Sequence, residues 1–192
     1  MAAERWDFAL TGAWVLTGCG LVGRGLPRPV GRLMRKPDKE PEEVIYFAYG
    51  SNMLECRIKG RTPSAEAVGV GRLEGMKVVM NKRGADGSGK ANLMEDPEGV
   101  TYGVLYRIDS SEIHLLDDAE RGYERRTVVV YSGGELVGAQ TYISDDLTDV
   151  PVAYDWYKDI ILNGAREHGL PEDHIGYLES LPSKPSESGN TC

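Results

Sequence analysis

The order of the predicted elements indicates an α+β fold. An apolar run rich in β-forming residues, 44–49, is followed by a short helical segment. Strand-like segments at 76–81 and 100–108 come next, and a Gly-Gly turn inside 126–143 predicts a hairpin. Two segments with helical features lie near the C-terminus. The hairpin makes at least part of the sheet antiparallel.

The first strand stops abruptly at Gly50-Ser51-Asn52. Val, Ile, Tyr and Phe suit a buried strand, whereas Gly tolerates a positive φ and Ser and Asn favour turns and helix caps. Residues 53–58 can continue as a short helix. The turn would then present backbone N–H groups at a helix N-terminus, where they bind an anionic or carbonyl oxygen. We therefore expect a ligand-binding loop at 50–52.

A glycine pattern at 84–90 follows a strand and matches half of a phosphate-binding loop. Ala91 stands where that motif has the Ser or Thr that holds magnesium, and 92–99 lacks helical periodicity. The Gly, Asp and Ser content predicts a mobile surface loop instead.

Capping signals and periodicity predict the later helices. Residues 109–112 have the spacing of a capping box, and the helix that follows should end near 120–122. Apolar residues repeat at helical spacing over 153–164, and Gly169 stops that helix. The segment 171–181 predicts one more short helix.

Length and charge limit the classes of protein. The chain has 192 residues, of which 41% are hydrophobic and 27% are charged, and this suits one domain with tails. No apolar run approaches the roughly 18 residues of a membrane span. The net charge is −8 and the basic residues are scattered. We expect neither a nucleic-acid partner nor a membrane partner.

The cysteines and histidines indicate no metal centre. The 3 cysteines are an odd number without a C-x-x-C pair, which argues against a disulfide framework and a zinc site and favours a reducing cytoplasm. The 3 histidines lack H-E-x-x-H spacing. No metal and no cofactor are expected.

The N-terminal 40 residues do not resemble part of a packed domain. Their G-x-G-x-x-G match at 18–23 is followed by Pro27 and Pro29, where a dinucleotide-binding fold has a helix, so the match is coincidental. A lipoprotein cleavage box at 16–19 is a weaker interpretation, because the acidic residues near Arg5 oppose a positive leader. A disordered extension, or a true start at Met34, is the interpretation we prefer. The predicted division is therefore 1–40 extension, 41–181 domain and 182–192 disordered tail.

Three segments carry a family resemblance. They are Tyr46-Phe47-Ala48-Tyr49-Gly50-Ser51-Asn52, the segment 116–123, and the stretch from Trp156 to Pro171. In this order they resemble the gamma-glutamylcyclotransferases, enzymes that release 5-oxoproline from gamma-glutamyl compounds. The resemblance implies an α+β fold with a small, partly closed mixed β-barrel and flanking helices. It also implies a transferase or lyase type of chemistry, a small gamma-glutamyl substrate, no cofactor and the capacity to form a homodimer.

The resemblance also assigns roles to residues. Glu120 matches the family's catalytic glutamate and would act as general base, although position alone does not separate it from Asp117, Asp118 or Glu124. Arg121 follows it where many relatives have Gly. The substrate-binding residues implied are those of the first motif and one tyrosine of the C-terminal helix: Tyr46, Phe47, Ala48, Tyr49, Gly50, Ser51, Asn52 and Tyr157.

Each assignment has a simpler alternative. Tyr49 and Tyr157 could be core aromatics, and the Gly-Ser-Asn loop could be an ordinary turn between strand and helix. Acyl-enzyme chemistry on Ser51 is not favoured, because no G-x-S-x-G elbow or neighbouring histidine would activate it. A protein of another class, a noncatalytic binder of gamma-glutamyl or amino-acid ligands, is the alternative function.

Overall fold

The computed structural model describes residues 42–186. The predictions for 1–40 and for the end of the C-terminal tail lie outside these residues. The strands are β1 (Glu43–Ala48), β2 (Glu66–Arg83), β3 (Gly89–Asp109), β4 (Glu124–Ser132), β5 (Glu135–Ile143), β6 (Ala153–Tyr154) and β7 (Ser183–Lys184). The helices are α1 (Glu55–Arg61), α2 (Ile113–Ala119), α3 (Asp155–Glu167) and α4 (Glu172–Ser180), with 3-10 turns η1 (Ser51–Met53) and η2 (Ser110–Glu112).

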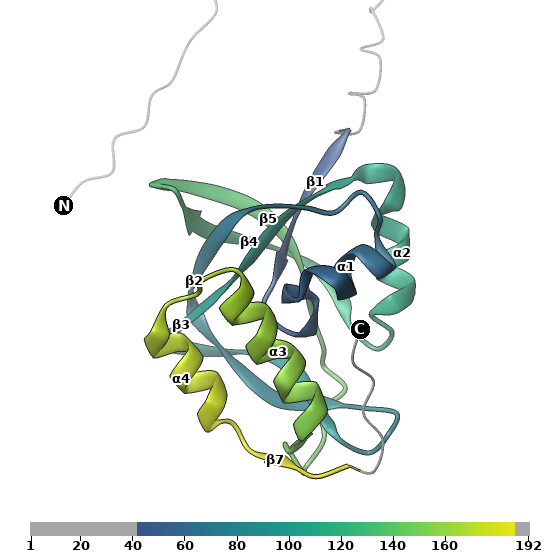
Figure 1. Ribbon diagram of the computed structural model, residues 1–192, viewed down its shortest axis with the longest axis vertical. Helices are drawn as coiled ribbons and strands as arrows, with labels where there is room; N and C mark the ends of the chain where they lie inside the picture. Colours follow the sequence, from purple (N-terminus) through teal and green to yellow (C-terminus); the bar gives the residue numbers. More distant parts are fainter. Residues whose placement is uncertain (1–41, 187–192) are drawn as a thin grey trace, which may run out of the picture. The chain divides into compact units, whose positions relative to one another are not determined.

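The main sheet closes into a barrel with the strand order β1-β3-β2-β4-β5 (Figure 1). The pairs β1–β3, β2–β3 and β4–β5 are antiparallel, whereas β1 and β5 meet in parallel at Tyr46 and Gln140. Helices α3 and α4 lie side by side near β2 and β3 (Figure 1). The α+β prediction and the mixed barrel with flanking helices are confirmed.

Two strands are longer than the sequence indicated. The segments 66–73 and 76–81 form one strand, β2, which bends at irregularities near Gly69, Gly75 and Asn81. Strand β3 begins at Gly89, so only 84–88 is a turn and the predicted loop was too long. Bulges interrupt the side-chain alternation that marks a strand in sequence.

The core fixes β1 tightly against β3. Phe47 is fully buried, and Gly103 lies against it. A Cβ atom at Gly103 would lie 2.8 Å from a Phe47 ring carbon and 2.3 Å from the Ala48 carbonyl oxygen. Only glycine permits this approach, and it holds the end of β1, where the Gly-Ser-Asn loop begins.

Several local predictions need correction. Asp109 caps η2 by accepting from the Ser111 amide at 2.9 Å, but Glu112 accepts from the Ser64 amide at 2.9 Å instead of completing a capping box. The Glu112 carboxylate thus accepts from a distant amide instead of from the amide of its own helix N-terminus. Strand β7 pairs with β6, so ordered structure extends past the predicted boundary at residue 181.

Cys56 is disulfide-bonded, although the odd number of cysteines argued against a disulfide framework. Three cysteines leave one pair available, which sequence spacing does not reveal. Cys19 and Cys192 lie outside the described residues.

Candidate active site

A small cavity lies where β1 ends and α2 ends. It measures about 20 Å³ and is lined by Tyr46, Tyr49, Gly50, Ser51, Asn52, Ala91, Glu120, Tyr123, Tyr142 and Tyr157. A space of this size holds about one water molecule. A larger ligand therefore enters only when lining or covering side chains turn aside.

The Gly-Ser-Asn loop forms one wall of the cavity. The sequence suggested that Gly50 is needed for a positive φ. Its dihedral angles are φ −120° and ψ −142°, so a positive φ is not the reason for glycine at this position. It is there for space, because a Cβ atom would lie 3.1 Å from Ala91 Cβ and 3.9 Å from the Tyr157 hydroxyl. A side chain at position 50 would fill part of the cavity.

Residues of β3 and of the C-terminal end of α3 hold the loop in place. The Tyr106 hydroxyl donates to the Met53 carbonyl at 2.8 Å, and His168 Nε2 lies 3.0 Å from the same hydroxyl. The Met53 amide donates to the Gly50 carbonyl at 3.0 Å. Within residues 42–186, the amides of Ser51 and Asn52 have no acceptor. They remain as donors at the wall of the cavity.

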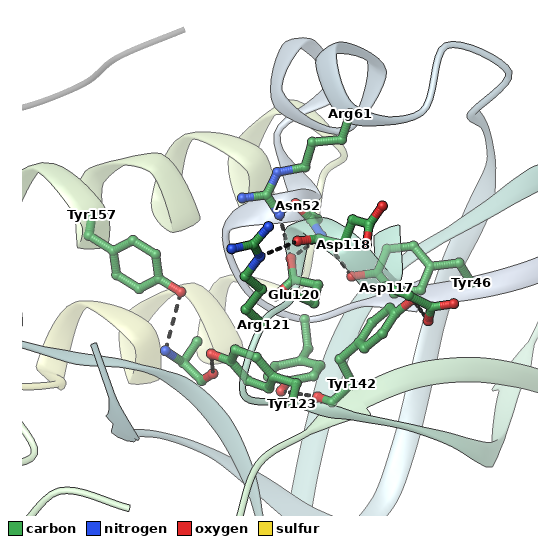
Figure 2. A network of polar contacts seen from close by, with 12 residues as sticks. Tyr46, Asn52, Arg61, Asp117, Asp118, Glu120, Arg121, Tyr123, Tyr142 and Tyr157 are labelled. Atoms are coloured by element: carbon green, nitrogen blue, oxygen red, sulfur yellow. Dashed lines mark hydrogen bonds and ion pairs between the residues drawn. The ribbon is translucent and has the colours of Figure 1, made fainter. Parts of the chain in front are cut away.

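Glu120 lies at the C-terminal end of α2 and joins a polar network with the loop (Figure 2). Asn52 Nδ2 lies 2.9 Å from Glu120 Oε1 and 2.9 Å from the Tyr46 hydroxyl. Arg61 Nη1 donates to Asn52 Oδ1 at 2.8 Å and forms an ion pair with Glu120 Oε1. The Glu120 side chain is 15% exposed and that of Arg61 is 22% exposed. The carboxylate is therefore charge-paired, oriented and still reachable.

Tyrosines form the rest of the wall. The Tyr157 hydroxyl accepts from the Ala91 amide at 3.2 Å, and the Tyr123 hydroxyl donates to the Ala91 carbonyl at 2.7 Å (Figure 2). The Tyr142 hydroxyl donates to Asp117 Oδ1 at 2.8 Å. Burial, with the Glu120 charge as a lesser contribution, raises the pKa of Tyr46, Tyr123 and Tyr157. These hydroxyls stay protonated and can donate hydrogen bonds.

The structure brings most of the proposed site residues together. Glu120, Tyr157 and five residues of the first motif line the cavity: Tyr46, Tyr49, Gly50, Ser51 and Asn52. Phe47 and Ala48 are fully buried and are not among the lining residues, because they pack within the barrel.

Sequence reasoning missed four residues. Ala91, Tyr123 and Tyr142 line the cavity, and Arg61 pairs with Glu120. Tyr123 lies within the segment 116–123, which carries the family resemblance. Arg61 is only nine residues from Asn52, so closeness in sequence could have indicated it. Nothing in the sequence placed Ala91 or Tyr142 beside the loop.

A larger groove of about 620 Å³ lies elsewhere, beside β1 and β5. Its lining includes Glu43, Ile45, Ile113, Arg125 and Gln140. It contains neither Glu120 nor the loop donors. We place the candidate site at the small cavity because the hydrogen-bonded carboxylate and the loop meet there.

Two further observations bear on the site. Among residues 42–186, no three His, Cys, Asp or Glu side chains are grouped as metal ligands would be. No helix in the same part of the chain has the length and apolar character needed to cross a membrane.

Fold and cavity together define an α+β barrel protein with a small polar site built around one paired carboxylate. The AIG2-like family model matches residues 100–178. A mouse gamma-glutamylcyclotransferase is 32% identical over 156 residues, covering 74% of this chain and 81% of the relative. The human gamma-glutamylcyclotransferase is 31% identical over 155 residues, with coverages of 76% and 81%. A solved gamma-glutamyl cyclotransferase superposes with a TM-score of 0.71 at 28% identity, covering 78% and 93%. The chain belongs to the gamma-glutamylcyclotransferase family.

Proposed function

We propose that the protein releases 5-oxoproline and a free amino acid or amine from a gamma-glutamyl substrate. The observation that carries this proposal is the contact between Asn52 and Glu120, which joins the Gly-Ser-Asn loop to a carboxylate at one cavity. The names of the relatives support a cyclotransferase activity in general. The residue roles below are our own assignment.

The protein must contribute to the reaction in three ways. The substrate's α-ammonium must lose a proton, its chain must be held folded, and negative charge on the attacked γ-carbonyl oxygen must be stabilised. Glu120 accepts the proton. The free amides of Ser51 and Asn52 donate to the carbonyl oxygen, and the tyrosine walls exclude water.

The steps balance without a cofactor. The α-amine nitrogen attacks the γ-carbon, and a new C–N bond closes a five-membered ring. The bond from the γ-carbon to the leaving nitrogen then breaks as the proton held by Glu120 passes to that nitrogen. The ring nitrogen loses its second surplus proton to the released amine, which leaves as an ammonium. Glu120 returns to its ionised form, so one carboxylate serves as base and then as acid.

Substrate entry requires the Arg61–Glu120 pair to open. In the structure Arg61 occupies the Glu120 oxygen that also accepts from Asn52. The substrate's α-ammonium takes the place of the Arg61 guanidinium at this carboxylate. Because one cation replaces another, the charge balance around Glu120 is kept.

Release of 5-oxoproline from a mixed library of gamma-glutamyl amino acids and amines tests the function. We expect 5-oxoproline and an equimolar amine, in the presence and absence of a chelator. Binding of a library member without release would favour the noncatalytic alternative and would contradict the proposal.

A further inference from the structure

Arg57, close to the candidate site, has a donor that finds no partner among residues 42–186. Its side chain is half-buried, and its Nε atom is fully buried with no hydrogen-bond acceptor in this part of the chain. A buried donor that lacks an acceptor costs free energy, and in native proteins such a group usually serves a purpose. An arginine is a natural partner for a carboxylate, because its planar fork donates two parallel hydrogen bonds.

The position of Arg57 follows from its helix. Arg57 and Arg61 are four residues apart on α1, so they share one face of that helix. Arg61 reaches Glu120 and Asn52. Arg57 interacts electrostatically with Arg61, with Tyr157 and with Glu120. Arg57 therefore lies within electrostatic range of both Glu120 and Tyr157, although it is not among the residues that line the cavity.

Among Arg57, Arg61 and Glu120 the charges do not cancel. Arg57 and Arg61 carry two positive charges, whereas Glu120 carries one negative charge. Burial and the neighbouring Arg61 guanidinium both lower the pKa of Arg57, which marks the cost of holding two cations together. A second carboxylate at this point would relieve that repulsion.

A gamma-glutamyl group supplies such a carboxylate. Its α-carbon bears both the ammonium that the proposed mechanism delivers to Glu120 and a carboxylate. When the ammonium lies at Glu120, the α-carboxylate must lie close by, and without a cation it would be repelled by Glu120. We propose that Arg57, together with Arg61 once it is displaced, binds the α-carboxylate of the substrate and so restricts the site to glutamyl groups with a free α-carboxylate. This inference rests on the proposed function.

The test compares two substrates and two variants. The substrates are γ-glutamylalanine and the analogue whose glutamyl α-carboxylate is a carboxamide. We expect the wild type to prefer the carboxylate in kcat/KM by about tenfold or more, the size of one hydrogen bond to a charged group. In Arg57→Gln this preference should fall well below the wild-type value, to what Arg61 alone provides, mainly through a higher KM for the carboxylate substrate.

The control is Lys59→Gln on the same helix, because Lys59 is exposed and pairs with Glu55. It should keep the wild-type preference. A structural role of Arg57 alone would lower kcat/KM for both substrates by the same factor, and that result would overturn the inference while leaving the proposed function standing.

Calorimetry separates the two ideas if no gamma-glutamyl compound is turned over. The wild type should bind 5-oxoproline more tightly than 5-oxoprolinamide, and Arg57→Gln should reduce the difference. Equal affinities in the wild type, or no binding of either compound, would overturn the assignment of Arg57.

Discussion

Asn52 Nδ2 donates to Glu120 Oε1 at 2.9 Å, although 68 residues separate the two along the chain. The contact joins the turn after β1 to the end of α2. Because Arg61 bonds to both residues, the three side chains hold one another in place. Two segments that are distant in sequence, the turn after β1 and the end of α2, therefore determine the geometry of the candidate site together. Substitutions in either segment test it.

The first prediction concerns Glu120→Gln. The amide keeps the shape of the side chain but cannot accept the proton of an α-ammonium, so turnover should fall by roughly 10²–10⁴ in kcat. Substrate affinity should change far less, since the loop amides hold the glutamyl chain. Steady-state kinetics of 5-oxoproline release measure both quantities.

Glu124→Gln is the control for this change. Glu124 begins β4, is exposed and pairs with Arg126 instead of lining the cavity. Its variant should retain kcat. Similar losses in both variants would mean that the wrong glutamate has been chosen.

The second prediction concerns the contact between α3 and the loop. A Cβ atom at Gly164 would lie 2.4 Å from the Leu54 amide nitrogen and 2.6 Å from the Met53 carbonyl carbon. Gly164→Ala should therefore lower the free energy of unfolding by about 1–3 kcal/mol, the usual cost of overpacking. Urea denaturation followed by circular dichroism measures this change.

Gly176→Ala is its matched control. Gly176 is exposed inside α4, and a Cβ atom there meets nothing within 4 Å. Alanine should raise the free energy of unfolding by about 0.5–1 kcal/mol through helix propensity. If both variants had the same effect, the close packing of α3 on the loop would be disproved.

The third prediction concerns pH and His174. This side chain is 4% exposed and lies against the rings of Tyr102 and Tyr177, and its Nε2 atom has no partner within the described residues 42–186. Burial lowers the pKa of His174 from 6.5 to about 4. Its contribution is complete above the unfolded pKa, near 6.5, and is lost as the pH falls through 4.

Stability should thus decline by at most about 3 kcal/mol between these pH values because of this residue. Denaturation at a series of pH values should show a shallower acid decline in His174→Leu than in the wild type. Parallel declines in the two proteins would show that His174 does not contribute.

The fourth prediction concerns the first 40 residues, whose structure is outside the described part of the chain. Their proline and glycine content and the start of β1 at Glu43 indicate that the domain does not need them. A protein beginning at Met34 should melt at the same temperature as the full chain by calorimetry. A loss of several degrees would show that the extension stabilises the domain.

The sequence by itself determined the elements whose signals are local. The β-forming residues before Gly50, the Gly133-Gly134 turn and the apolar spacing of 153–164 each predicted an element that the structure contains. Local backbone preference and side-chain periodicity suffice for such elements. The loop and Glu120 were found through a motif resemblance, not through physical reasoning about position.

Only the tertiary structure decided which residues meet. Ala91 and Tyr142 reach the cavity because β3 and β5 close the barrel around β1, and Arg61 meets Glu120 because α1 lies beside α2. Gly50 is required by a neighbour 41 positions away in sequence and not by its own dihedral angles. Such contacts depend on strand order and packing, which bring together residues far apart in sequence. They produce no periodic pattern of residues within any one segment.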